Sequence, residues 1–239
     1  MYKRVLLKLS GESIKGDSDL IIDAEFVDQI AKMIKKLYDK KIQLAIVIGA
    51  GNIFRGKIAE DVGIERVPAD FMGMMGTVMN AIAVSSALKK YNVESVVFSA
   101  LPAIKGITLD YEENAAKSAL NEGKVVFCAG GTGKPYFSTD TASTMRALEL
   151  NCEAIFMGKN GVKGIYDSDP RKNPDAKFFK DITYDEILER KLAVMDLTAV
   201  ELIKDKDIDI RVFSMTDLDN FERVVNGEDI GTTCHRKGK

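Results

Sequence analysis

The stretch KVVFCAGGTGKPYFSTDTASTMRALEL, Lys124 to Leu150, combines three features that together predict an α/β fold. Its first five residues, KVVFC, are rich in β-branched and aromatic side chains, which is typical of a buried strand. A glycine-rich turn follows, and Thr139 or Asp140 is suited to cap a helix over 140–150. Backbone N–H groups at the amino end of such a helix attract anions. The stretch therefore predicts a strand–turn–helix unit with a possible anion site.

Gly131 to Lys134 (GTGK), within this turn, ends like a phosphate-binding P-loop, but two positions exclude that motif. A P-loop needs a glycine five positions before its last glycine, and a Ser or Thr after its lysine. Cys128 and Pro135 occupy those two positions. Proline offers neither a hydroxyl for a metal ion nor a backbone N–H for a phosphate oxygen. The turn must hold a ligand in another way, or hold none.

Segments typical of strands alternate with segments typical of helices along the chain. This alternation predicts an α/β fold, with a mainly parallel central sheet sandwiched by helices on both faces. Apolar runs typical of buried strands occupy 4–10, 43–48, 95–99, 124–128, 154–157 and 210–213. Helices are expected over 23–41, 70–90, 112–121, 140–150, 184–190, 196–204 and 218–226. Asp23 is the expected N-cap of the first of these helices. Ligands of such sheets bind at the carboxyl ends of the strands.

Composition narrows the classes of protein to which the chain can belong. Its 239 residues are 46% hydrophobic and 29% charged, as in an ordinary soluble globular protein. The formal net charge of −2 lacks the basic excess of a nucleic-acid-binding protein, and no apolar run reaches 18 residues, so neither nucleic acid nor a membrane is an expected partner. Cys128, Cys152 and Cys234 fit no metal-binding spacing and are expected to be reduced and buried in a cytoplasmic protein. His235, the lone histidine, lies in a polar tail and is a poor candidate for catalysis.

Two loops that follow predicted strands are suited to bind phosphate. Lys8 to Gly11 (KLSG) would place an ammonium group beside free backbone N–H groups, which suits phosphoryl transfer because that reaction depends on positioning and charge stabilisation. Gly49 to Gly56 (GAGNIFRG) lacks the dinucleotide-binding spacing, but its small residues admit an anion and Arg55 could clamp phosphate oxygens. Taken singly, the first loop is more simply a lysine reaching solvent, and the second is equally well a tight turn.

Two further loops add to this pattern. Asp140, after the turn of the opening stretch, could order nearby lysines, meet Mg²⁺ or simply cap its helix. Gly158 to Pro170 (GKNGVKGIYDSDP) suits a purine and its ribose, or a surface hairpin. Asp70 brings a carboxylate to the start of a helix. Four such loops at one edge of one sheet, with a lysine and an arginine among them, favour an anionic phosphate ligand.

Six segments, in order along the chain, match a known family: KLSGE, IGAGNIFRG, ADFMGMMGTVMN, GGTGKPYFSTDTA, GIYDSDP and VMDLTA. With them the chain resembles the bacterial uridylate kinases of the amino acid kinase superfamily. ADFMGMMGTVMN together with the FRG loop is specific, because other members of the superfamily share only the first lysine motif. The resemblance implies an amino acid kinase-like fold, transfer of the γ-phosphoryl group of ATP to UMP in pyrimidine nucleotide biosynthesis, Mg²⁺ with the ATP, and a homohexamer.

The resemblance also implies which residues act on each substrate. Lys8, Arg55 and Asp140 would be catalytic, with Lys8 stabilising charge on the transferring phosphoryl group. The ATP site would comprise Lys8, Leu9, Ser10, Gly11, Gly51, Arg55, Asn160, Tyr166 and Asp169. The UMP site would comprise Ala50, Asp70, Gly131, Thr132, Gly133, Lys134, Pro135, Tyr136, Phe137 and Ser138. No protein metal ligand is assigned, because the ATP phosphates would hold most of the Mg²⁺. One domain, 1–239, would bind UMP through about 1–155 and the nucleoside of ATP through about 156–239.

The chain departs from the family's pattern at three places, which changes what we expect of the UMP site and of the response to GTP. Ala50 replaces a glycine, which would cost energy if its backbone needed a positive φ. Lys134 and Ser138 replace a neutral amide and a threonine, so contacts with uracil are expected to differ. The segment 14–23 (IKGDSDLIID) has Asp-Leu-Ile in place of the Gly-Phe-Gly-like run of GTP-responsive members, which argues against activation by GTP. Inhibition by UTP stays open.

Two other functions are consistent with the loops. A related kinase acting on carbamate or aspartate would share the first lysine, but its acceptor has no ribose for Asp70 to hold. A nucleotide-binding regulator without catalysis would be expected to lack Lys8 or Asp140, and both are present. The expected mechanism is direct in-line transfer without a covalent enzyme intermediate.

Overall fold

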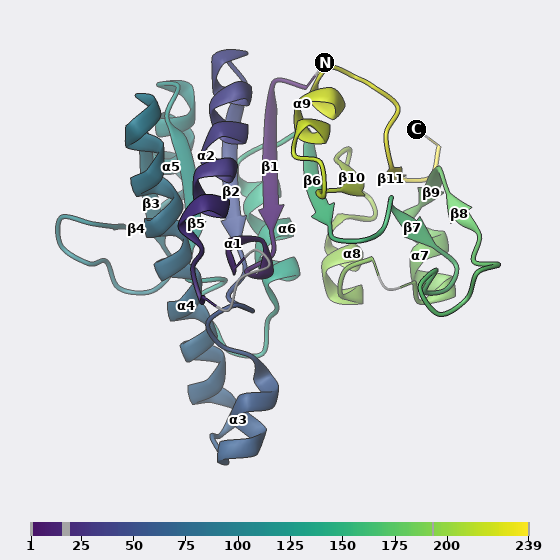
Figure 1. Ribbon diagram of the computed structural model, residues 1–239, viewed down its shortest axis with the longest axis horizontal. Helices are drawn as coiled ribbons and strands as arrows, with labels where there is room; N and C mark the ends of the chain where they lie inside the picture. The colour runs from purple at the N-terminus through teal and green to yellow at the C-terminus, as the bar shows by residue number, and fades with distance from the viewer. Residues whose placement is uncertain (1, 16–19, 193, 239) are drawn as a thin grey trace.

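The computed structural model describes residues 2–15, 20–192 and 194–238, and its centre is a nine-stranded sheet with the order β4-β3-β5-β2-β1-β6-β10-β11-β9 (Figure 1). All neighbouring strands are parallel except β10 and β11. The strands are β1 (Arg4–Leu9), β2 (Gln43–Ile48), β3 (Ser95–Ser99), β4 (Leu109–Asp110), β5 (Val125–Ala129), β6 (Ala154–Lys159), β9 (Asp181–Thr183), β10 (Asp209–Ser214) and β11 (Thr232–His235). A separate antiparallel pair joins β7 (Ile165–Tyr166) to β8 (Phe178–Phe179).

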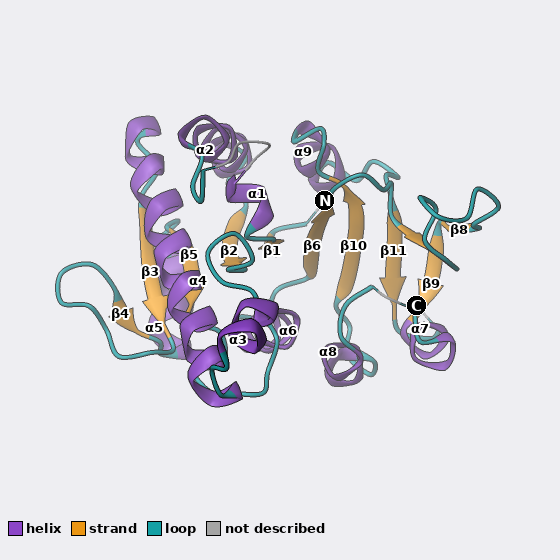
Figure 2. Cartoon of the chain, turned by 60° about the horizontal axis from the view of Figure 1, so that its bottom comes forward, coloured by secondary structure: helices purple, strands orange, loops and turns teal. Residues whose placement is uncertain are grey.

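Helices cover both faces of the sheet, as Figure 2 shows for α2 and α9 on one side and α6, α7 and α8 on the other. The helices are α1 (Glu12–Lys15), α2 (Ala24–Asp39), α3 (Gly56–Val62), α4 (Arg66–Leu88), α5 (Glu113–Asn121), α6 (Thr139–Glu149), α7 (Tyr184–Arg190), α8 (Leu197–Ile203) and α9 (Asp219–Val225), with a 3₁₀ turn at Lys89–Tyr91. The predicted three-layer α/β fold is confirmed.

The sheet separates two hydrophobic cores, because successive side chains of a strand point to opposite faces. In β1, Val5, Leu7 and Leu9 belong to the core under α2, α4 and α9, whereas Leu6 belongs to the core over α5 to α8. All of these side chains are fully buried. By the same alternation Lys8 points to the face that α6 covers. The core positions therefore determine where the polar side chains at the strand ends point.

Most predicted elements are confirmed to within a few residues, but two local predictions were wrong. Ser138, not Thr139 or Asp140, is the N-cap of α6, and its side chain accepts a hydrogen bond from the backbone N–H of Thr141. His235 lies not in a free tail but in β11, where it faces Asp181 of β9. Asp23 does cap α2, and the three cysteines are free and buried as expected.

Helix α4 is the longest helix, and it begins before the predicted start. Pro68 lies in its first turn, where a missing N–H costs no helical hydrogen bond. The segment Arg66–Tyr91 is long and apolar enough to cross a membrane by composition, yet half of its most apolar window is buried inside the protein. Val84 and Leu88 of this helix are fully buried against the sheet. Packing against the sheet therefore accounts for the apolar residues on the buried side of this helix.

Candidate active site

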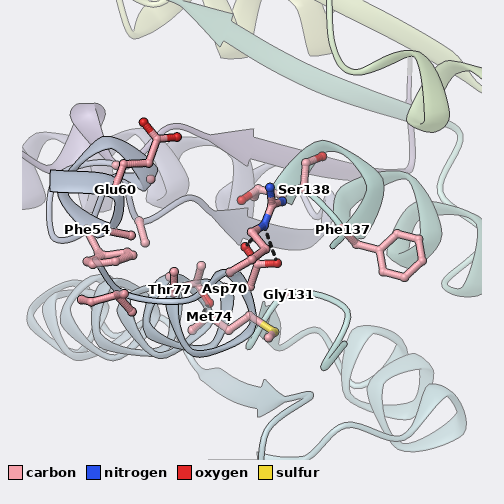
Figure 3. Close-up of a pocket in the computed structure, with 17 residues that line it drawn as sticks. Phe54, Glu60, Asp70, Met74, Thr77, Gly131, Phe137 and Ser138 are labelled. Atoms are coloured by element: carbon pink, nitrogen blue, oxygen red, sulfur yellow. Dashed lines mark hydrogen bonds and ion pairs between the residues drawn. The ribbon is translucent and has the colours of Figure 1, made fainter. Parts of the chain in front are cut away.

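A cavity of about 550 Å³ opens at the carboxyl ends of β2 and β5, between α3, α4 and the turn before α6 (Figure 3). A pocket of this size is typical of small-ligand sites. Among the predicted UMP residues, Ala50, Asp70, Gly131, Phe137 and Ser138 line it. The other predicted members, Thr132, Gly133, Lys134, Pro135 and Tyr136, belong to the adjoining turn but do not line the cavity.

Asp70 joins α4 to this turn. Its two carboxylate oxygens share the single N–H of Arg66 Nε, at 2.8 and 2.9 Å, and one of them accepts a hydrogen bond from the backbone N–H of Tyr136 at 2.7 Å. Tyr136 has a φ of 71°, which is unusual for a residue other than glycine. The bond from its backbone N–H to Asp70 holds this conformation at the edge of the cavity. Asp70 thus has a structural partner on each side and points into the cavity region in Figure 3.

Ala50 adopts no positive φ, so the backbone cost expected from its replacing a glycine does not arise. Its methyl group packs instead against α4 at Gly76, where an added Cβ would lie 2.8 Å from the Cβ of Ala50. The glycine in the helix thus accommodates the alanine in the loop.

Several lining residues were not predicted from the sequence. Met74 lines the cavity while being only 8% exposed. Thr77 also lines the cavity and accepts a hydrogen bond of 2.8 Å from the backbone N–H of Gly130. Asn80 does not line the cavity, but it supports the neighbouring loop by donating a hydrogen bond of 2.8 Å to the Gly49 carbonyl. An asparagine within an otherwise apolar helix could have indicated that Asn80 bonds to a neighbouring loop, because a buried amide needs a hydrogen-bond partner. Phe54 and Glu60 complete the wall labelled in Figure 3.

Lys8 and Asp140 form an ion pair at 2.8 Å, with 17% and 21% of their side chains exposed. Asp140 also accepts a hydrogen bond of 3.1 Å from the backbone N–H of Asp196. Asp196 in turn caps α8 and accepts hydrogen bonds from the hydroxyls of Ser138 and Thr141. Strand β1, α6 and the start of α8 therefore meet at one charged cluster. No role had been predicted for Asp196.

The two amino-terminal loops pack closely together. A Cβ on Gly11 would lie 2.5 Å from the backbone nitrogen of Gly51 and 2.7 Å from the Gly49 carbonyl oxygen, so only glycine fits there. Arg55 donates to the Gly51 carbonyl at 2.9 Å and pairs with Glu12 at 2.6 Å. The Arg55 side chain is 58% exposed, and Glu12 is a partner that the sequence did not indicate.

A second cavity, of about 430 Å³, lies beyond the carboxyl ends of β6 and β10. All three predicted residues of the ATP nucleoside site, Asn160, Tyr166 and Asp169, line it. Hydrogen bonds from Arg171 lower the pKa of Asp169. Lys159 and Asp167, which belong to the predicted loop Gly158 to Pro170 but were given no individual role, also line this cavity. Arg190, Leu192 and Val194 line it as well and were not predicted.

Within residues 2–15, 20–192 and 194–238, no group of three or more His, Cys, Asp or Glu side chains could hold a metal ion. Mg²⁺ is usually bound through one or two carboxylates together with substrate phosphates. Asp140, beside the predicted phosphate loops, fits that limited protein contribution.

The segment 14–23, from which we predicted that GTP does not activate the protein, is described only in part. Residues 16–19 lie outside the described residues, and Asp19 is one of the residues on which that prediction rests, so it stays a prediction.

Comparisons with known proteins agree with this architecture. The model of the amino acid kinase family matches residues 3–214. A uridylate kinase of Streptococcus thermophilus is 45% identical over 238 residues, which cover 100% of this chain and 97% of the relative. The crystal structure of a UMP kinase from Bacillus anthracis superimposes with a TM-score of 0.95 at 35% identity, covering 99% of this chain and 97% of that one. A UMP kinase from Ureaplasma parvum gives a TM-score of 0.93 at 37% identity, covering 99% and 100%.

Proposed function

Because this chain belongs to the amino acid kinase family, and within it to the uridylate kinases, we propose that it transfers the γ-phosphoryl group of ATP to UMP, giving UDP and ADP. The reaction supplies the UDP from which UTP and CTP are made. The observation that carries this proposal is the arrangement of two cavities with the Lys8–Asp140 pair beside the loops that separate them.

The larger cavity is the proposed UMP site. Asp70 is placed to accept hydrogen bonds from the ribose hydroxyls, and Gly131 to Ser138 form the wall for the nucleoside. The smaller cavity, with Asn160, Tyr166 and Asp169, is the proposed site of the adenosine of ATP. The part of the single domain up to about residue 155 therefore binds the acceptor, and the part from about 156 binds the donor nucleoside.

Lys8 is the proposed catalytic cation. It stands at the end of β1, where an ammonium group can stabilise the charge on the transferring phosphoryl group. Leu9 to Gly11 and Gly51 offer backbone N–H groups to the ATP phosphates, and Arg55 reaches the same region from the next loop. Asp140 orients Lys8 through their ion pair. Mg²⁺ that accompanies ATP would neutralise further phosphate charge, and Asp140 is the carboxylate that would help to hold it.

Direct in-line transfer is consistent with the remaining side chains. Burial raises the pKa of the Cys128 thiol to about 12 and raises the pKa values of Cys152 and Cys234 as well, so none of the thiols is a ready nucleophile. His235 lies in β11 and lines neither cavity. Phosphoryl transfer between two bound nucleotides needs neither group.

We further propose a cytoplasmic homohexamer. The compartment is supported by three buried, unpaired cysteines, because reduced thiols persist in the cytosol. The hexamer rests on the family resemblance alone, and light scattering of the purified protein would test it.

A coupled assay of ADP release tests the proposed function, with ATP and Mg²⁺ against UMP, CMP, dUMP, carbamate and aspartate, with and without GTP. Turnover confined to UMP is the expected result. Turnover with carbamate or aspartate would identify a different kinase of the superfamily. No turnover with any acceptor, together with measurable UMP binding, would indicate a non-catalytic regulator.

A further inference from the structure

Lys159, the last residue of β6, lies on the same face of the sheet as Lys8. Strand β6 pairs with β1 in parallel, and Lys8 is in register with Met157. Residues two apart on a strand point to the same face, so Lys159 follows Met157 toward the carboxyl edge on the side that α6 covers. It also lines the second cavity next to Asn160. Two lysines from neighbouring strands therefore approach the same charged cluster.

The surroundings of Lys159 leave its ammonium group short of acceptors and of negative charge. Its Nζ donates a hydrogen bond of 2.8 Å to the Val194 carbonyl. An ammonium group has three N–H donors, and among the described residues this carbonyl is the acceptor it reaches. Asp140 is already paired with Lys8 at 2.8 Å. Lys8 and Lys159 thus both act on the Asp140 carboxylate, which Lys8 already occupies.

A purely structural role would be served better by a neutral donor. Burial first, and then the charge of Lys8, lower the pKa of Lys159, which means that its charged form is disfavoured in the free protein. A glutamine could hold the Val194 carbonyl without burying a charge. An anion entering the second cavity would reverse this penalty, because it would supply both acceptors and opposite charge.

We propose that Lys159 is a second phosphate-binding cation, which contacts the phosphate chain of the donor nucleotide from the nucleoside side while Lys8 acts at the transferring group. The inference rests on the proposed function, since it takes a nucleoside triphosphate to occupy the second cavity. Lys159 forms no covalent bond with the substrate and transfers no proton. It binds and orients the donor, and its effect falls on ATP and not on UMP.

The pH dependence of ATP binding follows from the groups that face Lys159. Lys8 on β1, Asp140 on α6 and Cys234 on β11 act on its charge. The cavity that Lys159 lines also holds the ionisable side chains of Asp167, Asp169, Arg171, Arg190 and Lys191. A lysine carries its charge below its pKa, so affinity for ATP is expected to fall as the pH rises through the lowered pKa of Lys159. Affinity for UMP is expected to show no such fall.

Three variants of the full chain separate charge from structure. Lys159→Gln keeps a donor for the Val194 carbonyl but removes the charge, Lys159→Arg keeps the charge, and Lys206→Gln removes an exposed lysine that lines neither cavity. We expect Lys159→Gln to lower kcat/KM for ATP by about 100-fold, the loss typical of one charge-stabilising donor. It should leave KM for UMP and the melting temperature unchanged and abolish the alkaline fall in ATP affinity. Lys159→Arg should recover part of the loss, and Lys206→Gln should match the wild type.

Calorimetric titration with ATP provides a readout that does not depend on turnover. Wild-type ATP affinity and kinetics in Lys159→Gln would overturn the inference. Equal losses for ATP and UMP in both Lys159 variants, with a lower melting temperature, would do the same and assign a structural role. If the wild type released no ADP with UMP, the proposed function would fail instead, and the ATP titrations would still decide the role of Lys159.

Discussion

The two cavities are built from different kinds of structure. The larger one is bounded by regular elements, chiefly the 23-residue α4, and by loops packed so closely that Gly11 tolerates no side chain. The smaller one is bounded largely by the segment between β6 and α7, in which β7 and β8 are two residues each. Its Asp169 is held by Arg171, which is 70% exposed. The proposed acceptor site is therefore supported mainly by long elements of the core, whereas the proposed donor site is supported mainly by short strands and loops. In both sites the acidic side chain is held by an exposed arginine, because Arg66 beside Asp70 is 65% exposed.

This difference has a physical consequence for specificity. A site supported by buried elements holds its polar groups in fixed positions and penalises a ligand that leaves them unpaired. A site formed by short strands and loops has weaker support, because few buried contacts hold those segments in place. Substitutions at the junction of the two sites should therefore affect catalysis most, and substitutions within one site should affect one substrate.

Removing the cation at the junction gives the largest expected effect. Lys8→Ala should lower kcat by about 1,000-fold, since a preorganised charge facing the transition state is lost. UMP binding should remain nearly unchanged, because Asp70 and the 131–138 turn are intact. Stopped-time ADP assays and calorimetric titration with UMP measure the two quantities. Near-normal turnover in this variant would contradict the assigned mechanism.

A crossed pair of substitutions sharpens the contrast between the sites. Asp70→Asn should raise KM for UMP by about 10-fold and spare ATP, whereas Asp169→Asn should raise KM for ATP and spare UMP, because each removes a charged acceptor. The Asp169 effect should be the smaller one, because the two-residue strands and loops around Asp169 give it less support than α4 gives Asp70. Initial rates with each substrate varied in turn give both constants. Equal effects of both variants on both nucleotides would show that the two cavities are not independent.

Close packing at the first two loops predicts a stability effect. Gly11→Ala should lower the free energy of unfolding by about 2 kcal/mol, because its Cβ would overlap backbone atoms that cannot move without disturbing β1 and β2. Gly56→Ala is the matched control, since no heavy atom lies within 4 Å of the added Cβ. Urea denaturation of both variants measures the difference. Equal stability of the two would show that the loops are not tightly packed.

The smallest expected effect concerns β11. Burial opposes the charged form of His235, but the Asp181 carboxylate at 2.6 Å and the Arg236 carbonyl outweigh it and raise its pKa. A raised folded-state pKa means that the stabilisation is present in acid and is lost as the pH rises through that pKa. His235→Asn should therefore lose about 0.5 kcal/mol relative to the wild type near pH 5 and nothing near pH 9. Urea titrations at both pH values would show it, and a pH-independent difference would refute it.

The long elements were predictable because their signals are local. The strand from Gln43 to Ile48 is a run of apolar residues bounded by turn formers, and the helix capped by Asp23 repeats its apolar residues at helical spacing. The missed elements have no such pattern. Strands β4, β7 and β8 are two residues long, and α3 is short and polar, so they form only where the rest of the chain supports them.

The site divides in the same way. Loops suited to phosphate could be recognised one at a time, because glycines, a lysine and an arginine follow predicted strands. The contacts between these loops could not be recognised from the sequence, because each joins residues of different elements. They are the pairs Lys8–Asp140, Arg55–Glu12 and Asp140–Asp196. Lys159 was missed for the same reason, since a lysine at a strand end is recognisable as buried and crowded only when its neighbours are known.

The sequence by itself determined the alternation of strands and helices, the position of the glycine-rich loops and the residue types available for phosphate chemistry, because these depend on neighbours along the chain. The tertiary structure alone decided that β1 lies between β2 and β6, and that order brings Lys8, Asp140 and Lys159 together between two cavities. It also decided that Ala50 needs no positive φ, because Gly76 of α4 makes room for its methyl group. Strand order and close packing depend on the whole chain burying its apolar surface at once, which no local pattern specifies.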